Sequence, residues 1–131
     1  MSMEYIVQYR EDQNIVAATA KGEWDPRVDN DMVREVMEIV DASGGAKVLL
    51  DIRELRFDIS IVRALERALE VREYRQGFTT VSRRTAIVYS SVNEKVDESV
   101  IFFETVSRNR GLPFLTFTDM GKAMAWLLED K

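Results

Sequence analysis

The side chains able to carry chemistry in this sequence are carboxylates, hydroxyls, lysines, arginines and tyrosines. The chain has 131 residues and contains no histidine and no cysteine. Histidine titrates nearest to neutral pH, and cysteine is a strong nucleophile and a common zinc ligand. The usual general base, the thiol nucleophile and the thiolate or imidazole metal site are therefore excluded. We expect a protein that binds rather than catalyses, with no metal and no cofactor.

A group of charged and hydroxyl side chains follows the strand predicted in the middle of the chain. Arg53 ends this strand and Arg56 follows it, and Asp58, Ser60 and Arg63 lie where the next helix begins. The free amide groups of a helix start are commonly capped by aspartate or serine, which is the simpler interpretation of Asp58 and Ser60. In the alternative, Ser60 is a phosphoacceptor, because a phosphate there would gain from the helix dipole and the nearby arginines.

Other polar residues end the neighbouring predicted strands. Ligands of open α/β sheets bind beyond the carboxyl ends of parallel strands. The residues expected at this edge are therefore either the mouth of a polar pocket or ordinary loop residues and caps: Asp51, Glu54, Ser90, Ser91, Thr118 and Asp119. No glycine-rich phosphate loop is present, because Gly44-Gly45 precedes a strand instead of following one.

Aromatic residues suggest a second kind of site, an apolar cavity between helices. Phe103 belongs to a helical core stripe with Val100, whereas its neighbour Phe102 lies near the edge of that stripe. Core packing is the simpler interpretation of large rings. The candidate walls of a cavity are Phe57, Phe78, Phe102, Phe103 and Trp126.

The charge pattern narrows the classes of partner. The chain has 18 basic and 23 acidic residues, a net charge of −5, and no basic stripe of the kind that nucleic acids require. Between Arg63 and Glu73 basic and acidic residues interleave, which predicts a solvent-exposed helix face. No segment approaches the ~20 apolar residues of a membrane span, and residues 1–10 lack a secretory signal pattern. We expect a cytoplasmic protein that does not bind nucleic acid.

Hydrophobic periodicity and capping signals predict the elements that position these residues. Alternating patterns predict strands at 4–10 and 15–20, and short apolar runs predict buried strands at 47–53, 84–90 and 114–117. Helices are expected at 25–44, 59–76, 91–110 and 118–128. In the first, third and fourth helices the predicted caps are Asp25, Ser91 and Thr118 or Asp119. The order ββαβαβαβα predicts one α/β domain over residues 1–131. Its five-stranded sheet would be mostly parallel, with an antiparallel first strand and four helices.

Three stretches of the sequence resemble the SpoIIAA-like branch of the STAS domains. These stretches are residues 47–51 (Lys-Val-Leu-Leu-Asp), 55–58 (Leu-Arg-Phe-Asp) and 117–127, which begins Phe-Thr-Asp and ends Ala-Trp-Leu. STAS domains are small bacterial proteins related to anti-sigma-factor antagonists and are often paired with the lipid-binding Sec14 fold. The resemblance implies a one-way superhelix of strand–helix turns, with the helices largely on one side of the sheet. Such winding lacks the reversal at which Rossmann-type nucleotide clefts form.

The resemblance also implies a function. Regulatory members of the family carry a phosphorylatable serine in an Asp-Ser-Ser-Gly sequence, and this chain has Asp58-Ile59-Ser60-Ile61. Asp58 matches, Ile59 stands at the usual serine position, and the glycine is absent. The implied function is a non-enzymatic module that docks a protein partner, such as an anti-sigma-type kinase, around residues 58–63. The alternative is a carrier or sensor of a small apolar ligand or lipid. A sheet face without helices would favour a homodimer.

Overall fold

The computed structural model describes residues 2–57, 61–78 and 81–129. The elements, in chain order, are β1 (Glu4–Arg10), β2 (Ile15–Glu23), α1 (Pro26–Ala42), β3 (Lys47–Arg56), α2 (Ile61–Arg75), β4 (Thr85–Val88), α3 (Glu94–Asn109), β5 (Phe114–Phe117) and α4 (Met120–Leu127).

The five strands form one sheet whose spatial order is the order of the sequence, β1-β2-β3-β4-β5. β1 pairs with β2 antiparallel, and every later strand pairs with its predecessor in parallel. The winding therefore advances across the sheet without reversing. The predicted mixed α/β sheet and the order ββαβαβαβα are confirmed.

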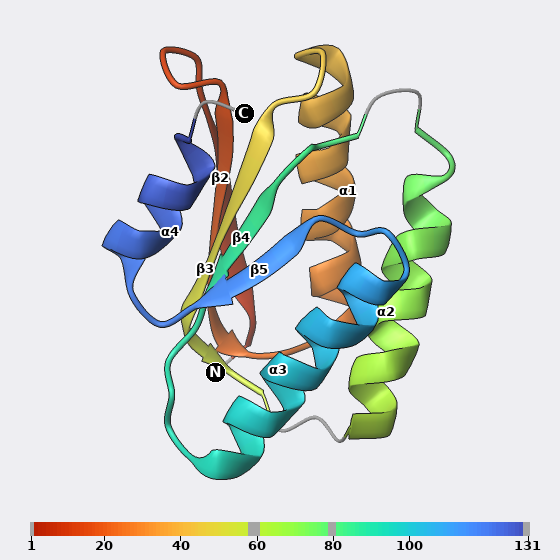
Figure 1. Ribbon diagram of the computed structural model, residues 1–131, viewed down its shortest axis with the longest axis vertical. Helices are drawn as coiled ribbons and strands as arrows, with labels where there is room; N and C mark the ends of the chain where they lie inside the picture. The colour runs from red at the N-terminus through yellow and green to blue at the C-terminus, as the bar shows by residue number, and fades with distance from the viewer. Residues whose placement is uncertain (1, 58–60, 79–80, 130–131) are drawn as a thin grey trace.

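The two faces of the sheet are covered differently, as Figure 1 shows. Alternation along β2 sends Val16 and Ala18 into the core beneath α1, and Ile15 and Ala17 into the core beneath α4. α1, α2 and α3 lie on one side, and α4 covers part of the other. On β1, Ile6 is 65% exposed. The homodimer expected from an uncovered face stays a prediction.

β3 extends to Arg56, three residues beyond the strand predicted at 47–53. Its register shifts along the way, because Thr19 of β2 pairs with Asp51 whereas Lys21 pairs with Glu54. One extra residue on β3 forms a bulge, which reverses the alternation of side chains beyond it. Leu55 consequently joins the core cluster beneath α1 that also holds Val48. The bulge thus keeps the end of the strand apolar on the same face as its beginning.

The capping predictions are confirmed for α1 and α4 and wrong for α3. The Asp25 side chain accepts from the Arg27 amide, and the Asp119 side chain accepts from the Lys122 amide. The cap of α3 is Asn93, which accepts from the Val96 amide. Ser91 instead donates to the Oδ2 atom of Asp97, 2.7 Å away. An Asx cap two residues later satisfies the same free amides, so the helix begins later than expected.

Hydrophobic spacing in α2 predicts a core stripe of Ile61, Val62, Leu65, Ala68 and Leu69. Ala68 is fully buried, as predicted, and so is Ala64, but Leu69 is 40% exposed. α2 packs mainly against α3, and the small alanine side chains allow two helices to approach closely. The helix is therefore rotated relative to the stripe that its largest apolar residues suggest. The side chains of Ile61 and Val62 lie outside the described part.

Two glycines with positive φ allow a test of how closely the backbone of Ser2 approaches β2. Gly22 has φ +96°, and a Cβ atom there would collide with the backbone of Ser2. Gly44 has φ +80° and open space around it. We expect Gly44→Ala to cost about 1–2 kcal/mol of unfolding free energy through backbone strain alone. Gly22→Ala should cost more, because strain and collision add. Urea denaturation measures both, and equal losses would contradict the close approach of Ser2.

Candidate functional site

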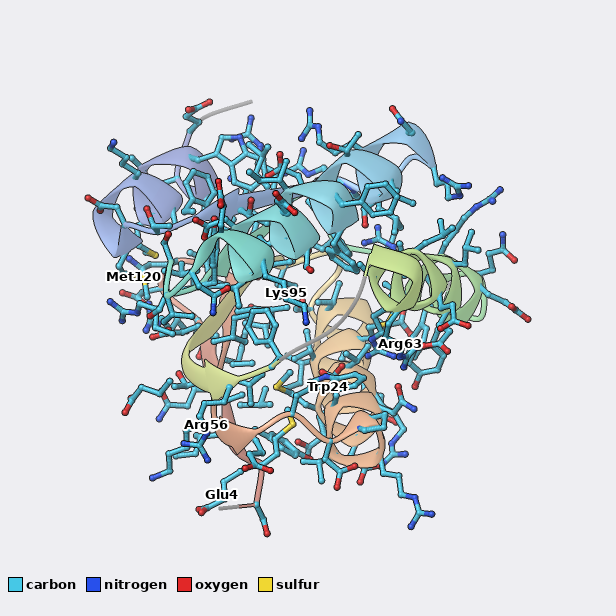
Figure 2. The ribbon with its side chains drawn as sticks, turned by 90° about the horizontal axis from the view of Figure 1, so that it is seen from below. Glu4, Trp24, Arg56, Arg63, Lys95 and Met120 are labelled. Carbon is cyan, nitrogen blue, oxygen red and sulfur yellow. The ribbon has the colours of Figure 1, made fainter. Side chains whose placement is uncertain are left out.

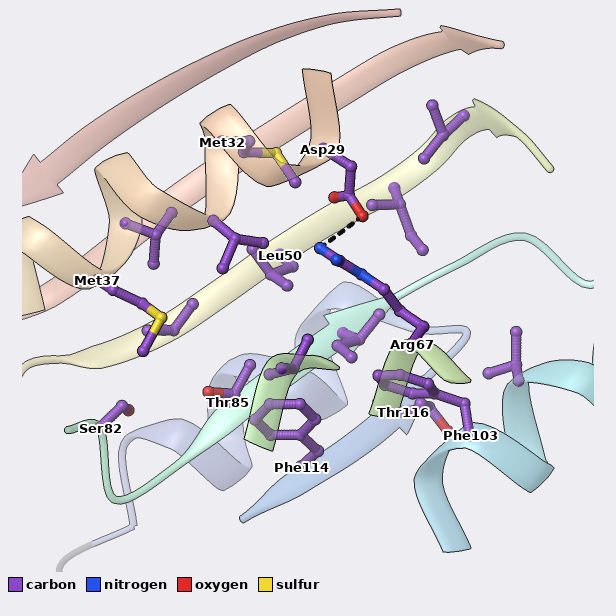
Figure 3. Close-up of a pocket in the computed structure, with 18 of the residues that line it drawn as sticks. Asp29, Met32, Met37, Leu50, Arg67, Ser82, Thr85, Phe103, Phe114 and Thr116 are labelled. Carbon is purple, nitrogen blue, oxygen red and sulfur yellow. Dashed lines mark ion pairs between the residues drawn. The ribbon is translucent and has the colours of Figure 1, made fainter. Parts of the chain in front are cut away.

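An apolar cavity of about 180 Å³ lies between α1, α2, α3 and one face of the sheet. Figure 3 shows side chains from α1, from the sheet and from α3 converging on it. Most of the lining is aliphatic or aromatic, and it includes Met32, Val36, Leu50, Ile87, Val100 and Phe114. An engineered apolar cavity of ~150 Å³ stays dry and binds a small apolar molecule. This cavity therefore has the size and lining of an apolar ligand site.

One face of α2 forms part of the cavity wall. The residues of α2 that line the cavity are Arg67, Val71 and Arg75, which follow one another at intervals of four along one face of the helix. Val71 packs with Ile87 and Phe114 of the sheet. A core-facing stripe is ordinarily apolar, so two arginines flanking a valine over an apolar cavity need an explanation in terms of their partners.

Arg67 is neutralised across the cavity by Asp29 of α1. Its Nη2 atom lies 2.8 Å from Asp29 Oδ2, and the two side chains are only 11% and 13% exposed. Trp24 Nε1 donates to the same carboxylate oxygen at 3.1 Å, and Arg67 Nη1 donates to Asn30 Oδ1 at 2.6 Å. We call Trp24, Asp29 and Arg67 the clamp, because they join α1 to α2; Figure 3 shows the Asp29–Arg67 ion pair among the residues that line the cavity.

Arg75 is partly buried and is not neutralised within the described residues. Its Nη2 atom donates to the Ser82 carbonyl oxygen at 3.1 Å, and its guanidinium carbon lies 5.8 Å from the centre of the Phe114 ring. Within the described ranges no carboxylate oxygen lies within 4 Å of its nitrogens. Desolvation by burial lowers the pKa of Arg75. Among the residues described, this part of the cavity wall thus holds one positive charge without a carboxylate partner.

The interleaved charges between Arg63 and Glu73 predicted a solvent-exposed face for this part of the helix. That assignment is wrong for Arg67, which is nearly buried. The sequence signal that indicates these cavity-lining residues is the spacing of Arg67, Val71 and Arg75 at every fourth residue. Such spacing places all three on one helix face, whatever their polarity.

The predicted cavity walls are only partly brought together. Phe57 and Phe103 line the cavity, and Phe103 stacks on Phe114 at a centroid distance of 6.1 Å. Phe78, Phe102 and Trp126 are not among the lining residues. Phe78 meets Tyr74 edge-on at 5.4 Å.

Trp126 lies on the opposite face of the sheet from the cavity. Its ring packs 5.8 Å from Phe117 within the core beneath α4, and the Arg84 guanidinium sits 4.9 Å above it. Arg84 also donates to the Trp126 carbonyl, and Lys47 Nζ donates to the Leu127 carbonyl. These two cations satisfy the carboxyl-terminal end of α4. Trp126 therefore fixes α4 to the sheet, and a role in the cavity is excluded by its position.

At the end of β3, Arg53 is held by Asp51. Arg53 Nε donates to Asp51 Oδ1 at 2.9 Å and Nη2 donates to Oδ2 at 2.8 Å. These hydrogen bonds hold the pKa of Asp51 below its usual range and raise the pKa of Arg53. Ser90 Oγ donates to the Arg53 carbonyl at 2.9 Å, which ties the segment after β4 to β3. Asp51, Arg53 and Ser90 are therefore joined at this edge, whereas Ser91 bonds to Asp97 and Asp119 caps α4.

The other two arginines of this edge also have acidic partners. Arg56 lies 3.7 Å from Glu23, and both side chains are largely exposed. Arg63 lies 3.2 Å from Glu70 and stacks 5.2 Å above the Trp24 ring, as Figure 2 shows for the labelled pair. Asp58 and Ser60 lie outside the described residues. The described arginines of this edge are therefore all paired with carboxylates.

The shifted pKa values offer no acid–base pair near neutrality. Burial and the neighbouring Asp97 raise the pKa of Tyr89, and a hydrogen bond with Glu35 raises that of Tyr5. In the described ranges no cluster of three or more acidic, histidine or cysteine residues is placed to hold a metal ion. The helices described include none that is long and apolar enough to cross a membrane.

Comparison with known proteins supports the fold. No protein-family model matches the sequence, and no curated protein matches it. Among solved structures, the chain is similar to the crystal structure of an anti-sigma factor antagonist from Mycobacterium paratuberculosis, with a TM-score of 0.60 and 13% sequence identity. The match covers 98% of this chain and 96% of that chain. The predicted SpoIIAA-like fold is therefore confirmed.

The clamp provides a test of how α2 is held over the cavity. Arg67→Met leaves Asp29 buried without its cation, so we expect a loss of about 3–5 kcal/mol of unfolding free energy. The matched control is Arg34→Met, because Arg34 forms an exposed pair with Asp31 at 3.3 Å and should lose less than about 1 kcal/mol. Denaturant unfolding followed by circular dichroism measures both. Similar small losses would show that the ion pair does not hold the helix.

Proposed function

We propose that this protein is a non-enzymatic regulatory module that binds a protein partner at the edge where β3 ends and α2 begins. The observation that carries the proposal is the likeness, over nearly the whole chain, to an anti-sigma factor antagonist. By its name, that protein acts on another protein. The absence of histidine and cysteine from the sequence supports a binding role, because it removes the commonest catalytic groups.

The charges at this edge support a partner with an acidic surface. Arg56 is 62% exposed, and its pair with Glu23 at 3.7 Å is long and solvent-exposed. Such a pair contributes little to stability, so Arg56 can exchange Glu23 for a carboxylate of the partner at little cost. Arg53 and Arg63 also belong to this edge, where they are paired with Asp51 and Glu70. Charge complementarity of this kind mainly sets specificity and the association rate.

Ser60 remains the candidate phosphoacceptor of this edge. It lies outside the described residues, so its role stays a prediction. A phosphate on Ser60 would add negative charge four residues after Arg56 and three before Arg63 in the sequence, and would compete with an acidic partner for these arginines. An anti-sigma-type kinase would be a partner that both docks at this edge and modifies it.

The docking edge can be tested by reversing one exposed charge. We expect Arg56→Glu to reduce retention of a specific partner from an extract of the source organism by at least about tenfold, since one like-charge contact replaces an attractive one. The matched control is Arg34→Glu on α1, where an arginine of similar exposure lies away from this edge. Quantitative mass spectrometry of the captured proteins measures the ratio. Equal retention by both variants would contradict docking at Arg56.

The cavity favours a second candidate function, the carriage or sensing of a small apolar ligand. The volume of about 180 Å³ and the mainly aliphatic lining are the supporting observations. A core that packed to the usual density would leave no such space, because interiors are as dense as molecular crystals. Space left above β3 and β4 is therefore consistent with a ligand that fills it.

Tryptophan fluorescence can test this second function, because Trp24 lines the cavity and Trp126 lies on the opposite face. Benzene, a neutral apolar probe that a cavity of ~150 Å³ can hold, should change the emission of Trp126→Phe, in which Trp24 is the remaining tryptophan. The matched control is Trp24→Phe, whose remaining Trp126 should give no change. An unchanged spectrum in both variants, together with no heat of binding, would exclude an apolar ligand of this size.

A further inference from the structure

We propose that two copies of this chain associate through β1, so that the sheet of one copy continues into the sheet of the other. In this arrangement the two β1 strands run antiparallel, and Val7 lies opposite the same residue of the second copy. Neither proposed function requires a second copy, so this surface is independent of both.

The outer edge of β1 carries free backbone groups. The Lys47 amide of β3 donates to the carbonyl of Asn14, directly before β2, so the even-numbered residues of β2 bond to β3 and its odd-numbered residues face β1. Ala17 of β2 pairs with Gln8, so the even-numbered residues of β1 bond to β2. In the described sheet β1 has no second neighbour. The residues whose N–H and C=O groups point to the open edge are therefore Tyr5, Val7 and Tyr9.

The opposite edge of the sheet is closed by side chains of α3. Glu104 accepts from the Thr116 amide of β5 at 2.6 Å, and Arg108 donates to the Phe114 carbonyl at 3.3 Å. Proteins protect edge strands in this way because an open edge can pair with another chain. Over the ranges that the structure describes, no side chain bonds to the backbone of β1. Of the two edges, β1 is thus the one left open for pairing.

The sequence of β1 is complementary to itself in this antiparallel register. With Val7 at the centre, Glu4 lies opposite Arg10 of the second copy, and Tyr5 lies opposite Tyr9 of the second copy. Glu4 and Arg10 are both exposed, and neither forms an ion pair with another described residue. Opposite charges that face each other across two strands stabilise their pairing, and two-fold symmetry forms this pair twice. The same register joins the residues whose backbone groups are free.

An exposed apolar side chain lies at the centre of the same edge. Tyr5 and Val7 pack against the core beneath α1, so Ile6 lies on the other face of the sheet, where it is 65% exposed. α4 covers β3, β4 and β5 on that face and leaves β1 uncovered. In the proposed register the two Ile6 side chains are diagonal neighbours across the junction, which removes apolar surface from water. Because β5 is closed, the association ends at two copies.

The simpler interpretation is that the polar residues of β1 only keep an edge strand solvated. Charged side chains on an edge strand discourage pairing with other chains. That role depends on the presence of charge and not on its sign. In the proposed register, by contrast, Glu4 and Arg10 must carry opposite signs. The two interpretations therefore differ in their response to charge reversal.

The experiment measures self-association by sedimentation velocity at low ionic strength over a range of protein concentrations. We expect a reversible dimer of the wild-type protein. Glu4→Arg and Arg10→Glu should each weaken it at least about tenfold, because symmetry places two like-charge contacts in either variant. An equimolar mixture of the two variants should associate as the wild type does, because opposite charges then face each other at both ends. The matched control is Lys122→Glu on α4, an exposed reversal of the same sign that should change nothing.

Three results would overturn the proposal. The first is a wild-type protein that stays monomeric at every concentration measured. The second is a dimer whose affinity is the same in Glu4→Arg, Arg10→Glu and the Lys122→Glu control, because it would form through another surface. The third is a mixture of the two β1 variants that associates no better than either variant alone.

Amide hydrogen exchange of the wild-type protein tests the register without any substitution. The amides of Tyr5, Val7 and Tyr9 should exchange more slowly at concentrations that populate the dimer, because they become hydrogen-bonded there. The amides of Ile6 and Gln8, which face β2, should change little. Exchange that does not depend on concentration would contradict pairing at this edge. Slow exchange of the same three amides in dilute, monomeric protein would show that another segment of the same chain covers the edge, and would also overturn the proposal.

Discussion

The ion pair between Asp29 and Arg67 is the interaction on which the geometry of the cavity depends. α2 packs mainly against α3 and reaches the sheet through side chains such as Val71. Its relation to α1 is therefore set by the clamp, in which a nearly buried carboxylate accepts from both Trp24 and Arg67. A buried pair of this kind contributes modest net stability, but the loss of either member leaves an uncompensated charge. The clamp thus fixes the spacing of the two helices more than it stabilises the fold.

The one-way winding of the chain determines which face of the sheet can hold a site. α4 presses Ala123 and Leu127 directly onto the sheet, so the core beneath α4 is filled. On the other face three helices share the sheet, and α2 stands furthest from it (Figure 1). The bulge in β3 keeps Leu55 on that face, which extends the apolar floor beyond the point where simple alternation would end it. The cavity therefore results from the one-way winding of the chain and from the extra residue in the β3 bulge.

The sequence predicted the fold well because its signals are local. Alternation in β2, the Asp25 and Asp119 caps, and short apolar runs each report on a few neighbouring residues, and together they gave the element order. The cavity depends instead on where α2 lies in space. Its exposed Leu69 and buried Ala68 reverse what hydrophobicity alone suggests, because contact with α3 selects the smaller residue. Likewise, Arg67 appears solvent-exposed in the sequence, since its partner Asp29 belongs to another helix.

The two candidate functions meet on α2, which limits how independent they can be. Arg63 begins the helix beside the proposed docking edge and stacks on Trp24, and Trp24 in turn donates to the carboxylate that holds Arg67. An occupant of the cavity that changed the distance between α1 and α2 would act on this same chain of contacts. By thermodynamic linkage, any effect of the ligand on partner affinity must equal the effect of the partner on ligand affinity. If the clamp has two arrangements, ligand binding and partner docking are coupled, and the regulatory module and the ligand carrier describe the same equilibrium. If the clamp has one arrangement, the two functions are independent.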